Sequence, residues 1–112
     1  MPVEQDYLDH VMEMLEPLGE VTKRSMFGGY GIFQGGVMFA LVASDTGLCL
    51  KVDEANQADF EEEGCAQFKT MPYFEVPADV MEEPERLREW AGKSVTIAHV
   101  AARKKTRQLK RR

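Results

Sequence analysis

Short apolar segments separated by tight turns fill residues 21–52 and constrain the fold more than any other feature. The segments VTKRSMF, GYGIF, VMFALVA and LCLKV follow one another, with turns such as QGG and SDTG between them. Each segment has the length of a strand, and LCLKV also alternates with the period of a strand. Connections this short join antiparallel neighbours. The sequence therefore predicts an antiparallel meander sheet with one face covered by helices.

Three other segments have the composition or period of helices. Apolar residues at three- and four-residue steps in residues 2–19 predict an N-terminal helix. A short second helix is expected with Asp53 as its N-cap and Gly64 at its end. A long third helix is expected from Pro84, with an apolar stripe that reaches Ala102.

Two further strands, CAQFKT and MPYFEVP, are expected in residues 65–77, where the prolines suggest an edge position or strand ends. At 112 residues the chain has the length of one domain with one core. We therefore predict a single two-layer α+β domain over residues 1–102, followed by a basic tail over residues 103–112.

The five glycines between positions 28 and 36 raise the question of a phosphate-binding loop. Gly29 and Gly31 match the first two positions of a GxGxxG fingerprint, but Gln34 occupies the third. A strand-like segment, VMFALV, comes next, where the fingerprint needs a helix N-terminus. We interpret these glycines as turn residues and points of close backbone approach, not as a nucleotide site.

No catalytic, metal-binding or cofactor-binding motif stands out in the sequence. His10 and His99 stand beside no serine, cysteine or acid in a recognisable motif, and their spacing suits no metal. Cys49 and Cys65 form no CxxC pair. We expect two reduced thiols, with a redox pair as the alternative if the fold brings them together. The prediction is a protein that is not an enzyme and takes no cofactor.

Charge is distributed unevenly along the chain. Seven of the 14 basic side chains lie in residues 103–112, which hold no acid, so residues 1–102 carry seven bases against 19 acids, a net of −12. Such a cluster of cations can neutralise phosphates without reading bases. The competing interpretation is a solvated or helical end that contacts no nucleic acid. The candidate nucleic-acid contacts are Arg103, Lys104, Lys105, Arg107, Lys110, Arg111 and Arg112.

The chain has no feature that directs it to a membrane. No apolar run approaches the roughly 18 residues that a spanning helix needs. The acidic N-terminus, MPVEQDYLDH, lacks both the basic and the apolar region of a signal peptide. We therefore expect a cytoplasmic protein.

Three stretches carry a resemblance to a known family: RSMFGGYGIFQGGVMFALV, GLCLKVDEANQADFEEEG and MPYFEVPADVMEEPERLREWA. Their order and spacing, over about residues 20–92, resemble the TfoX N-terminal domain family, also described as TfoX/Sxy-like. The resemblance implies a small α+β unit similar to the secretion-chaperone arrangement. It also implies regulation of bacterial competence together with the transcription machinery, although full-length relatives carry a second domain where this sequence has its basic tail.

The resemblance supplies no catalytic motif, and the positions shared with the family look mainly structural. Met26, Phe27, Tyr30 and Tyr73 are also candidates for an interaction surface. The leading hypothesis is a regulatory module that contacts an unidentified protein, with auxiliary nucleic-acid contact by the tail. The alternative is a chaperone-like homodimer in which the tail only solubilises, since a sheet of this kind leaves edge strands that need cover.

Overall fold

The computed structural model describes residues 4–26, 28–44 and 46–110, with the backbone alone for residues 106–110. Five strands form one antiparallel sheet in the order β1-β2-β3-β4-β5, so each strand pairs with its neighbour in sequence. This arrangement confirms the predicted meander and the α+β class. The strands are β1 (Val21–Met26), β2 (Gly29–Gln34), β3 (Val37–Ala43), β4 (Gly47–Lys51) and β5 (Tyr73–Glu75).

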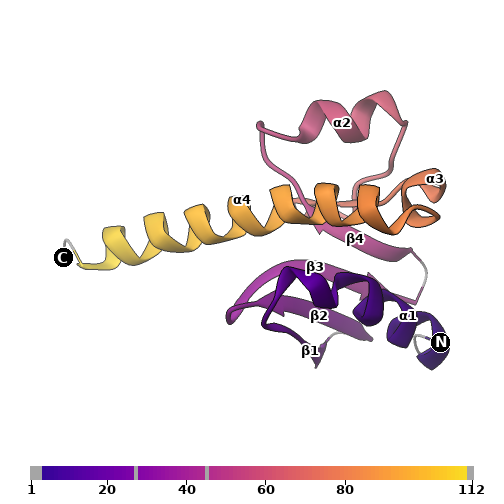
Figure 1. Cartoon of the computed structure of the whole chain (residues 1–112). Helices are drawn as coiled ribbons and strands as arrows, with labels where there is room; N and C mark the ends of the chain where they lie inside the picture. The colour runs from indigo at the N-terminus through magenta and orange to yellow at the C-terminus, as the bar shows by residue number, and fades with distance from the viewer. Residues whose placement is uncertain (1–3, 27, 45, 111–112) are drawn as a thin grey trace.

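Five helical segments complete the described part of the domain. Two of them, α1 and the long α4, lie on the same face of the sheet, as Figure 1 shows. Their apolar residues pack against that face. The segments are α1 (Gln5–Leu15), the short 3₁₀ turn η1 (Glu16–Leu18), α2 (Gln57–Glu62), α3 (Ala78–Met81) and α4 (Pro84–Lys110).

The main core lies between the sheet and these two helices. The largest fully buried side chains include Leu8 of α1, Phe39 of β3 and Leu87 of α4. Alternation along β4 places Leu48 and Leu50 in this core. Residues between them on the same strand must then face away from the helices, which leaves the sheet with a second, open face.

The glycines of residues 28–36 act as the sequence suggested, in turns and close approaches. Gly35 and Gly36 form the β2–β3 turn with φ values of 55° and 85°, which favour glycine. At Gly29 an added Cβ would collide with the carbonyl oxygen of Val42 on β3. These positions serve the hairpin backbone, and the segment after them is a strand.

The second helix begins later than predicted. Asp53 does not cap it; its Oδ1 instead accepts a hydrogen bond of 2.7 Å from the Ala55 amide and forms a turn. The N-cap position is Asn56, which is buried, and its Oδ1 accepts a hydrogen bond of 2.9 Å from the Asp53 amide. The prediction of an Asp53-capped helix was therefore wrong by one turn, because an Asx-type turn competes with the cap for the same residue.

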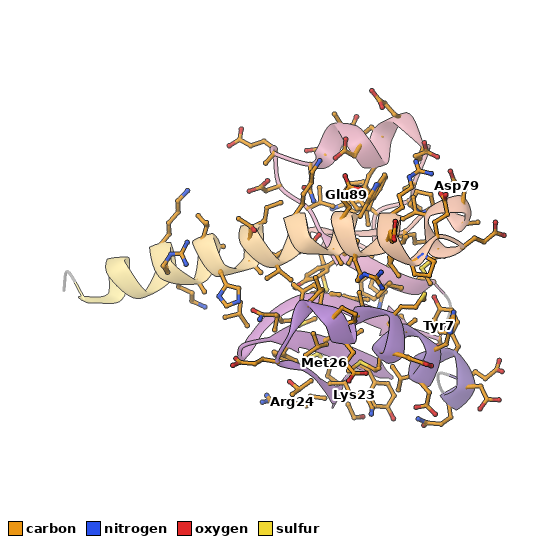
Figure 2. All side chains as sticks on the ribbon, in the orientation of Figure 1. Tyr7, Lys23, Arg24, Met26, Asp79 and Glu89 are labelled. Carbon is orange, nitrogen blue, oxygen red and sulfur yellow. The ribbon has the colours of Figure 1, made fainter. Side chains whose placement is uncertain are left out.

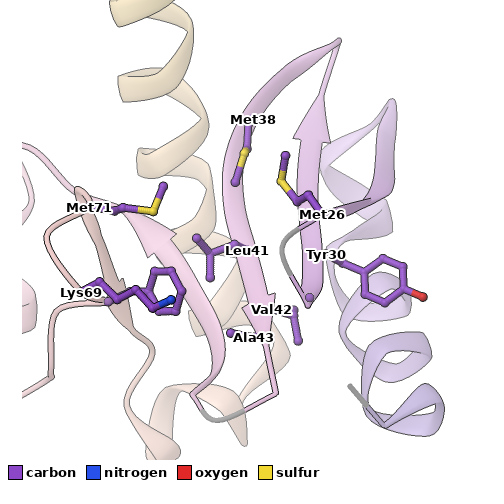
Figure 3. A pocket seen from close by; sticks show the side chains of 10 residues that line it. Met26, Tyr30, Met38, Leu41, Val42, Ala43, Lys69 and Met71 are labelled. Carbon is purple, nitrogen blue, oxygen red and sulfur yellow. The ribbon is translucent and has the colours of Figure 1, made fainter. Parts of the chain in front are cut away.

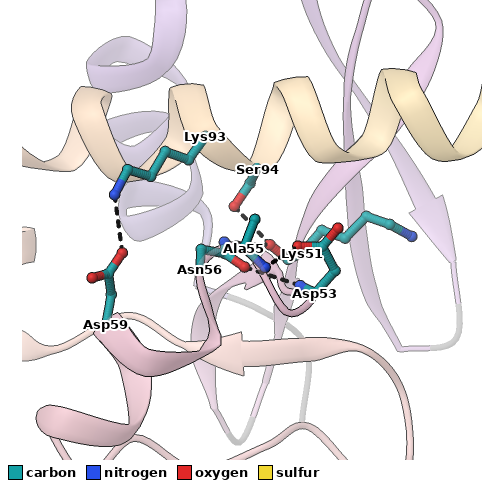
Figure 4. Close-up of polar contacts among 7 residues, drawn as sticks. All are labelled: Lys51, Asp53, Ala55, Asn56, Asp59, Lys93 and Ser94. Carbon is teal, nitrogen blue, oxygen red and sulfur yellow. Dashed lines mark hydrogen bonds and ion pairs between the residues drawn. The ribbon is translucent and has the colours of Figure 1, made fainter.

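A polar network, shown in Figure 4, ties this region to α4. The Lys51 carbonyl oxygen accepts hydrogen bonds from Ser94 Oγ at 2.8 Å and from Asn56 Nδ2 at 3.1 Å. Lys93 and Asp59 form an ion pair of 3.1 Å nearby. Because Ser94 and Asn56 are both buried, this shared acceptor fixes how α4 sits on the end of β4.

Only one of the two strands predicted in residues 65–77 is present. MPYFEVP contains β5, but CAQFKT makes a single isolated bridge, between Gln67 and Phe74. Lys69 has a φ of 53°, which reverses the chain before a longer ladder can form. Residues 65–72 therefore form an irregular loop, which a strand pattern could not describe.

Candidate interaction surface

The open face of the sheet is the main candidate site, and the strand register defines it. Arg24, Gly31, Leu41, Cys49 and Glu75 pair in a continuous row across all five strands. Residues paired in this way point to the same side of the sheet. Leu41 and Cys49, with Tyr73, form a small buried cluster separate from the main core.

A hollow of about 240 Å³ lies on this face, shown in Figure 3. Its side chains come from β1, β3 and the loop of residues 65–72, and most are apolar. A Cβ on Gly31 would lie 2.7 Å from Met26 Sδ and 3.3 Å from Met38 Sδ, so the missing side chain makes room for both thioethers. The side chains that surround the hollow are Met26, Met38, Leu41, Phe68, Lys69 and Met71.

Backbone hydrogen bonds hold the irregular loop over the open face. The Phe68 amide donates to the Tyr73 carbonyl at 2.7 Å, and the Val52 amide donates to the Pro72 carbonyl at 2.9 Å. Gln67 Nε2 donates to the Met71 carbonyl at 2.9 Å. Anchored in this way, the loop presents Met71, a large apolar side chain that is 41% exposed.

Three cations lie against aromatic rings around this face. Arg24 lies 5.1 Å from the Phe33 ring centroid. The Nζ of Lys51 lies 5.6 Å from the Tyr73 centroid, and that of Lys69 lies 5.3 Å from the Phe68 centroid. Each contact is worth about 0.5–1 kcal/mol at an exposed site. The rings therefore hold positive charge on the open face, and Lys69 also lines the hollow.

Of the three described residues that the sequence suggested for an interaction surface, Met26 and Tyr73 lie on the open face and the Tyr30 side chain does not. Met26 lines the hollow, and Tyr73 packs into the open-face cluster. The backbone of Tyr30 borders the hollow, but its side chain packs against the main core and points away from the other lining side chains in Figure 3. Phe27 lies outside the described residues.

Sequence reasoning did not single out the other open-face residues. Met38 faces the hollow because a β-bulge shifts the register between Ile32 and Phe33. Phe68 and Met71 lie in the irregular loop, where neither the strand nor the helix period applies. The sequence carried only a weak signal for Met38, which is a methionine within a segment that has the pattern of a buried strand.

The basic tail lies on a different part of the molecule. Helix α4 continues without a break through Lys110, and up to residue 105, where the described side chains end, its last buried residues are Ile97 and Ala98. At a rise of 1.5 Å per residue the helix extends about 18 Å beyond Ala98, and Figure 1 shows this end projecting from the body. Of the seven candidate nucleic-acid contacts, three are exposed on this helix, two lie where only the backbone is described, and two lie outside the described residues. In that order they are Arg103, Lys104 and Lys105; Arg107 and Lys110; Arg111 and Arg112.

His99 lies where the projecting part of α4 begins. Its Nε2 is 3.0 Å from the Gln34 carbonyl oxygen and 2.7 Å from Gln34 Oε1. Because both oxygens act only as acceptors, Nε2 carries a proton and donates. Gln34 Nε2 in turn donates to the Gly19 carbonyl at 2.9 Å. The histidine thus fastens the helix to the β2–β3 hairpin.

Groups with shifted pKa values are scattered and do not converge on one cavity. Burial raises the pKa of Tyr7, whose hydroxyl accepts a hydrogen bond of 2.9 Å from the Leu48 amide. Burial also raises the pKa of Tyr73 on the open face and of Cys65 near the main core. Within residues 4–26, 28–44 and 46–110, no three His, Cys, Asp or Glu side chains gather closely enough to hold a metal ion.

The two cysteines are not joined by a disulfide. Cys49 belongs to the open-face cluster, whereas Cys65 packs against the main core on the other side of the sheet. In the part of the chain that the structure describes, no helix is both long and apolar enough to pass through a bilayer.

The fold and site define a small two-layer α+β domain with a helix-covered sheet face and an open, apolar face. The chain belongs to the TfoX N-terminal domain family, whose model matches residues 13–98. This finding confirms the resemblance seen in the sequence and extends it at both ends.

A related protein is the DNA transformation protein TfoX1 of Aliivibrio fischeri, which is 35% identical over 94 residues. The match covers 76% of this chain and 44% of that protein. The chain therefore spans less than half the length of the curated relative that it matches.

Proposed function

We propose that this chain is a non-enzymatic regulatory domain of a DNA-transformation system, located in the cytoplasm, that works by contacting other macromolecules. It contacts a partner protein through its body and nucleic-acid phosphates through the basic end of α4. Membership of the TfoX N-terminal domain family and the name of the A. fischeri relative support this role. The two cysteines without a mutual disulfide are compatible with a reducing compartment.

The observation that carries the proposal is the separation of charge between the acidic body and the basic end of α4. The body has a net charge of −12, whereas residues 103–112 carry seven cations and no acid. Arg103, Lys104 and Lys105 are exposed on a helix that has already left the core. A polyanion can therefore approach the helix end without coming close to most of the acidic side chains.

The experiment is a salt series with a labelled DNA duplex and a labelled single strand. The tail-neutralised chain keeps full length but carries glutamine at all seven basic positions of residues 103–112, and glutamine preserves helix propensity. If all seven cations contact duplex phosphates, the slope of log K against log salt is about −6. The matched control carries Arg86→Gln, Arg88→Gln and Lys93→Gln, which remove body cations instead.

The proposal expects a steep slope for the natural chain and the control, and no binding by the tail-neutralised chain. A duplex affinity that stays constant between about 50 and 200 mM salt would refute phosphate contact by the tail. Binding that survives in the tail-neutralised chain would place the contact elsewhere on the body.

The second candidate is a chaperone-like homodimer with a solubilising tail, and the exposed edge of β1 favours it. This strand lies at one end of the sheet order, and its four central residues are exposed. A second copy can pair along such an edge. Light scattering during size-exclusion chromatography separates the two candidates, because a dimer has twice the monomer mass of 12.7 kDa.

A further inference from the structure

We propose that the open face of the sheet docks an acidic segment of a partner protein that carries large apolar side chains. The apolar side chains enter the hollow between Met26, Met38 and Met71, and the carboxylates lie beside Arg24, Lys51 and Lys69. This inference rests on the protein-contact role proposed for the chain, and it identifies the surface and the chemistry of its partner.

The cations of the body are placed in a way that favours an acidic partner. Residues 1–102 contain seven basic residues and 19 acidic residues. On the far side of the molecule Arg86 pairs with Asp79 at 3.0 Å. Arg86 also lies 6.0 Å from the Trp90 ring centroid, and Arg24, Lys51 and Lys69 lie near aromatic rings around the open face in the same way. Within the described residues, no acid forms an ion pair with any of these three.

Acids are also sparse on this face. Glu75 is the only acidic residue in the five strands that the structure describes. Figure 2 shows Lys23, Arg24 and Met26 at the β1 side of the molecule, with Asp79 and Glu89 on the opposite side around α3 and α4. A negatively charged partner segment is therefore attracted to the open face of an otherwise acidic body.

The size of the hollow and the flexible methionine side chains around it suit the side chains of a protein segment. Its volume of about 240 Å³ lies below the roughly 300–1,000 Å³ of small-molecule pockets. Three methionines surround it, and thioether side chains repack easily around apolar groups of different shapes. Met71 is already 41% exposed and can cover an inserted side chain.

A single-stranded nucleic acid is the competing occupant, because aromatic rings and cations on a sheet also form stacking platforms. Here the geometry is less suitable. Tyr73 is only 5% exposed, so its ring offers no face for a base. The rings of Phe33 and Phe68 already carry Arg24 and Lys69 within 5.3 Å of their centroids.

The test is an NMR titration of the chain labelled at its methionine methyl groups. The probe is a synthetic peptide in which leucine and phenylalanine alternate with aspartate and glutamate. One control peptide has lysine in place of every acid, and another has alanine in place of every large apolar residue. Because an acidic peptide also binds a basic tail, the titration is run on both the natural and the tail-neutralised chain.

We expect saturable shifts of the Met26, Met38 and Met71 methyl signals in both chains, while the signals of Met14 and Met81 on the helix side stay in place. Neither control peptide produces these shifts. Loss of one charge, by Arg24→Gln or Lys69→Gln, weakens binding about two- to fivefold. The matched Arg88→Gln variant leaves peptide binding unchanged. Met71→Ala weakens peptide binding, and the domain stays folded because Met71 is an exposed loop residue.

Four results would overturn the proposal. They are shifts confined to the natural chain, equal binding of the lysine peptide, shifts produced by single-stranded DNA but not by the acidic peptide, and concentration-dependent shifts without any peptide. The last would assign the face to a second copy. If the peptide does not bind but DNA binding shows the expected salt dependence, only the docking surface is rejected. If the peptide binds but DNA binding shows no salt dependence, only the role of the tail is rejected.

Discussion

Replacing Gly29 by alanine provides a direct test of how closely β2 and β3 approach. The new Cβ would collide with the Val42 carbonyl oxygen and would lie 3.1 Å from the Ala43 Cα. Both neighbours are backbone atoms of the central strand β3, so neither can move without disturbing the sheet. Overpacking of this kind costs about 1–3 kcal/mol, and the immobile backbone places Gly29→Ala near the upper limit.

Gly92 supplies the matched control for the same substitution. It lies inside α4, and an added Cβ there would meet nothing within 4 Å. Alanine in a helix interior is about 1 kcal/mol more favourable than glycine, so Gly92→Ala is expected to stabilise the domain. The two variants add the same methyl group, but we expect one to lower and the other to raise the free energy of unfolding.

Thermal unfolding followed by circular dichroism distinguishes these outcomes. An unfolding entropy of about 2.1 cal/mol/K per residue gives a shift in Tm of about 4 °C per kcal/mol for a chain of this length. We expect Gly29→Ala to lower Tm by about 10 °C and Gly92→Ala to raise it by about 4 °C. A Tm for Gly29→Ala within about 1 °C of the natural chain would contradict the strand packing described here.

Two further predictions concern buried polar groups. Ser94→Ala should lower the free energy of unfolding by about 1 kcal/mol in urea titrations, because the Lys51 carbonyl keeps its second donor, Asn56; a loss above about 3 kcal/mol would show that Asn56 does not compensate. Burial raises the pKa of Tyr73, so its folded-state contribution is present below the unfolded value of 10.0 and is lost as pH rises through the folded pKa. Urea titrations at rising alkaline pH should therefore show stability falling less steeply for Tyr73→Phe than for the natural chain, and equal slopes would count against the buried hydroxyl.

The sheet could be predicted from the sequence because its signals are local. Short connections force neighbouring strands to pair, and alternation along β4 separates Leu48 and Leu50 from Cys49. The start of α2 was less accessible, because Asp53 and Asn56 are both good capping residues. The Asp53 turn and the hydrogen bond from Asn56 to the Lys51 carbonyl place Asn56, and not Asp53, at the N-cap position.

The open-face site was only partly predictable. Met26 and Tyr73 could be proposed from the family resemblance, and both lie on that face. Met38 depends on a bulge. Met71 lies in an irregular loop that is held by local hydrogen bonds and by one bond from Val52 to Pro72, and neither the strand nor the helix period describes it. The pairing of Lys69 with Phe68 also requires the left-handed turn at Lys69, which a propensity pattern does not reveal.

Regulation of DNA transformation through the contact surfaces of this domain can be tested by transformation frequency in the organism that encodes it. The chromosomal gene would be deleted and complemented with the natural chain, the tail-neutralised chain, or the Arg24→Gln and Lys69→Gln double variant. We predict that deletion changes transformation, that the natural chain restores it, and that both variants restore it poorly although they fold normally. An unchanged frequency after deletion would contradict the regulatory role, and full restoration by both variants would contradict the two surfaces.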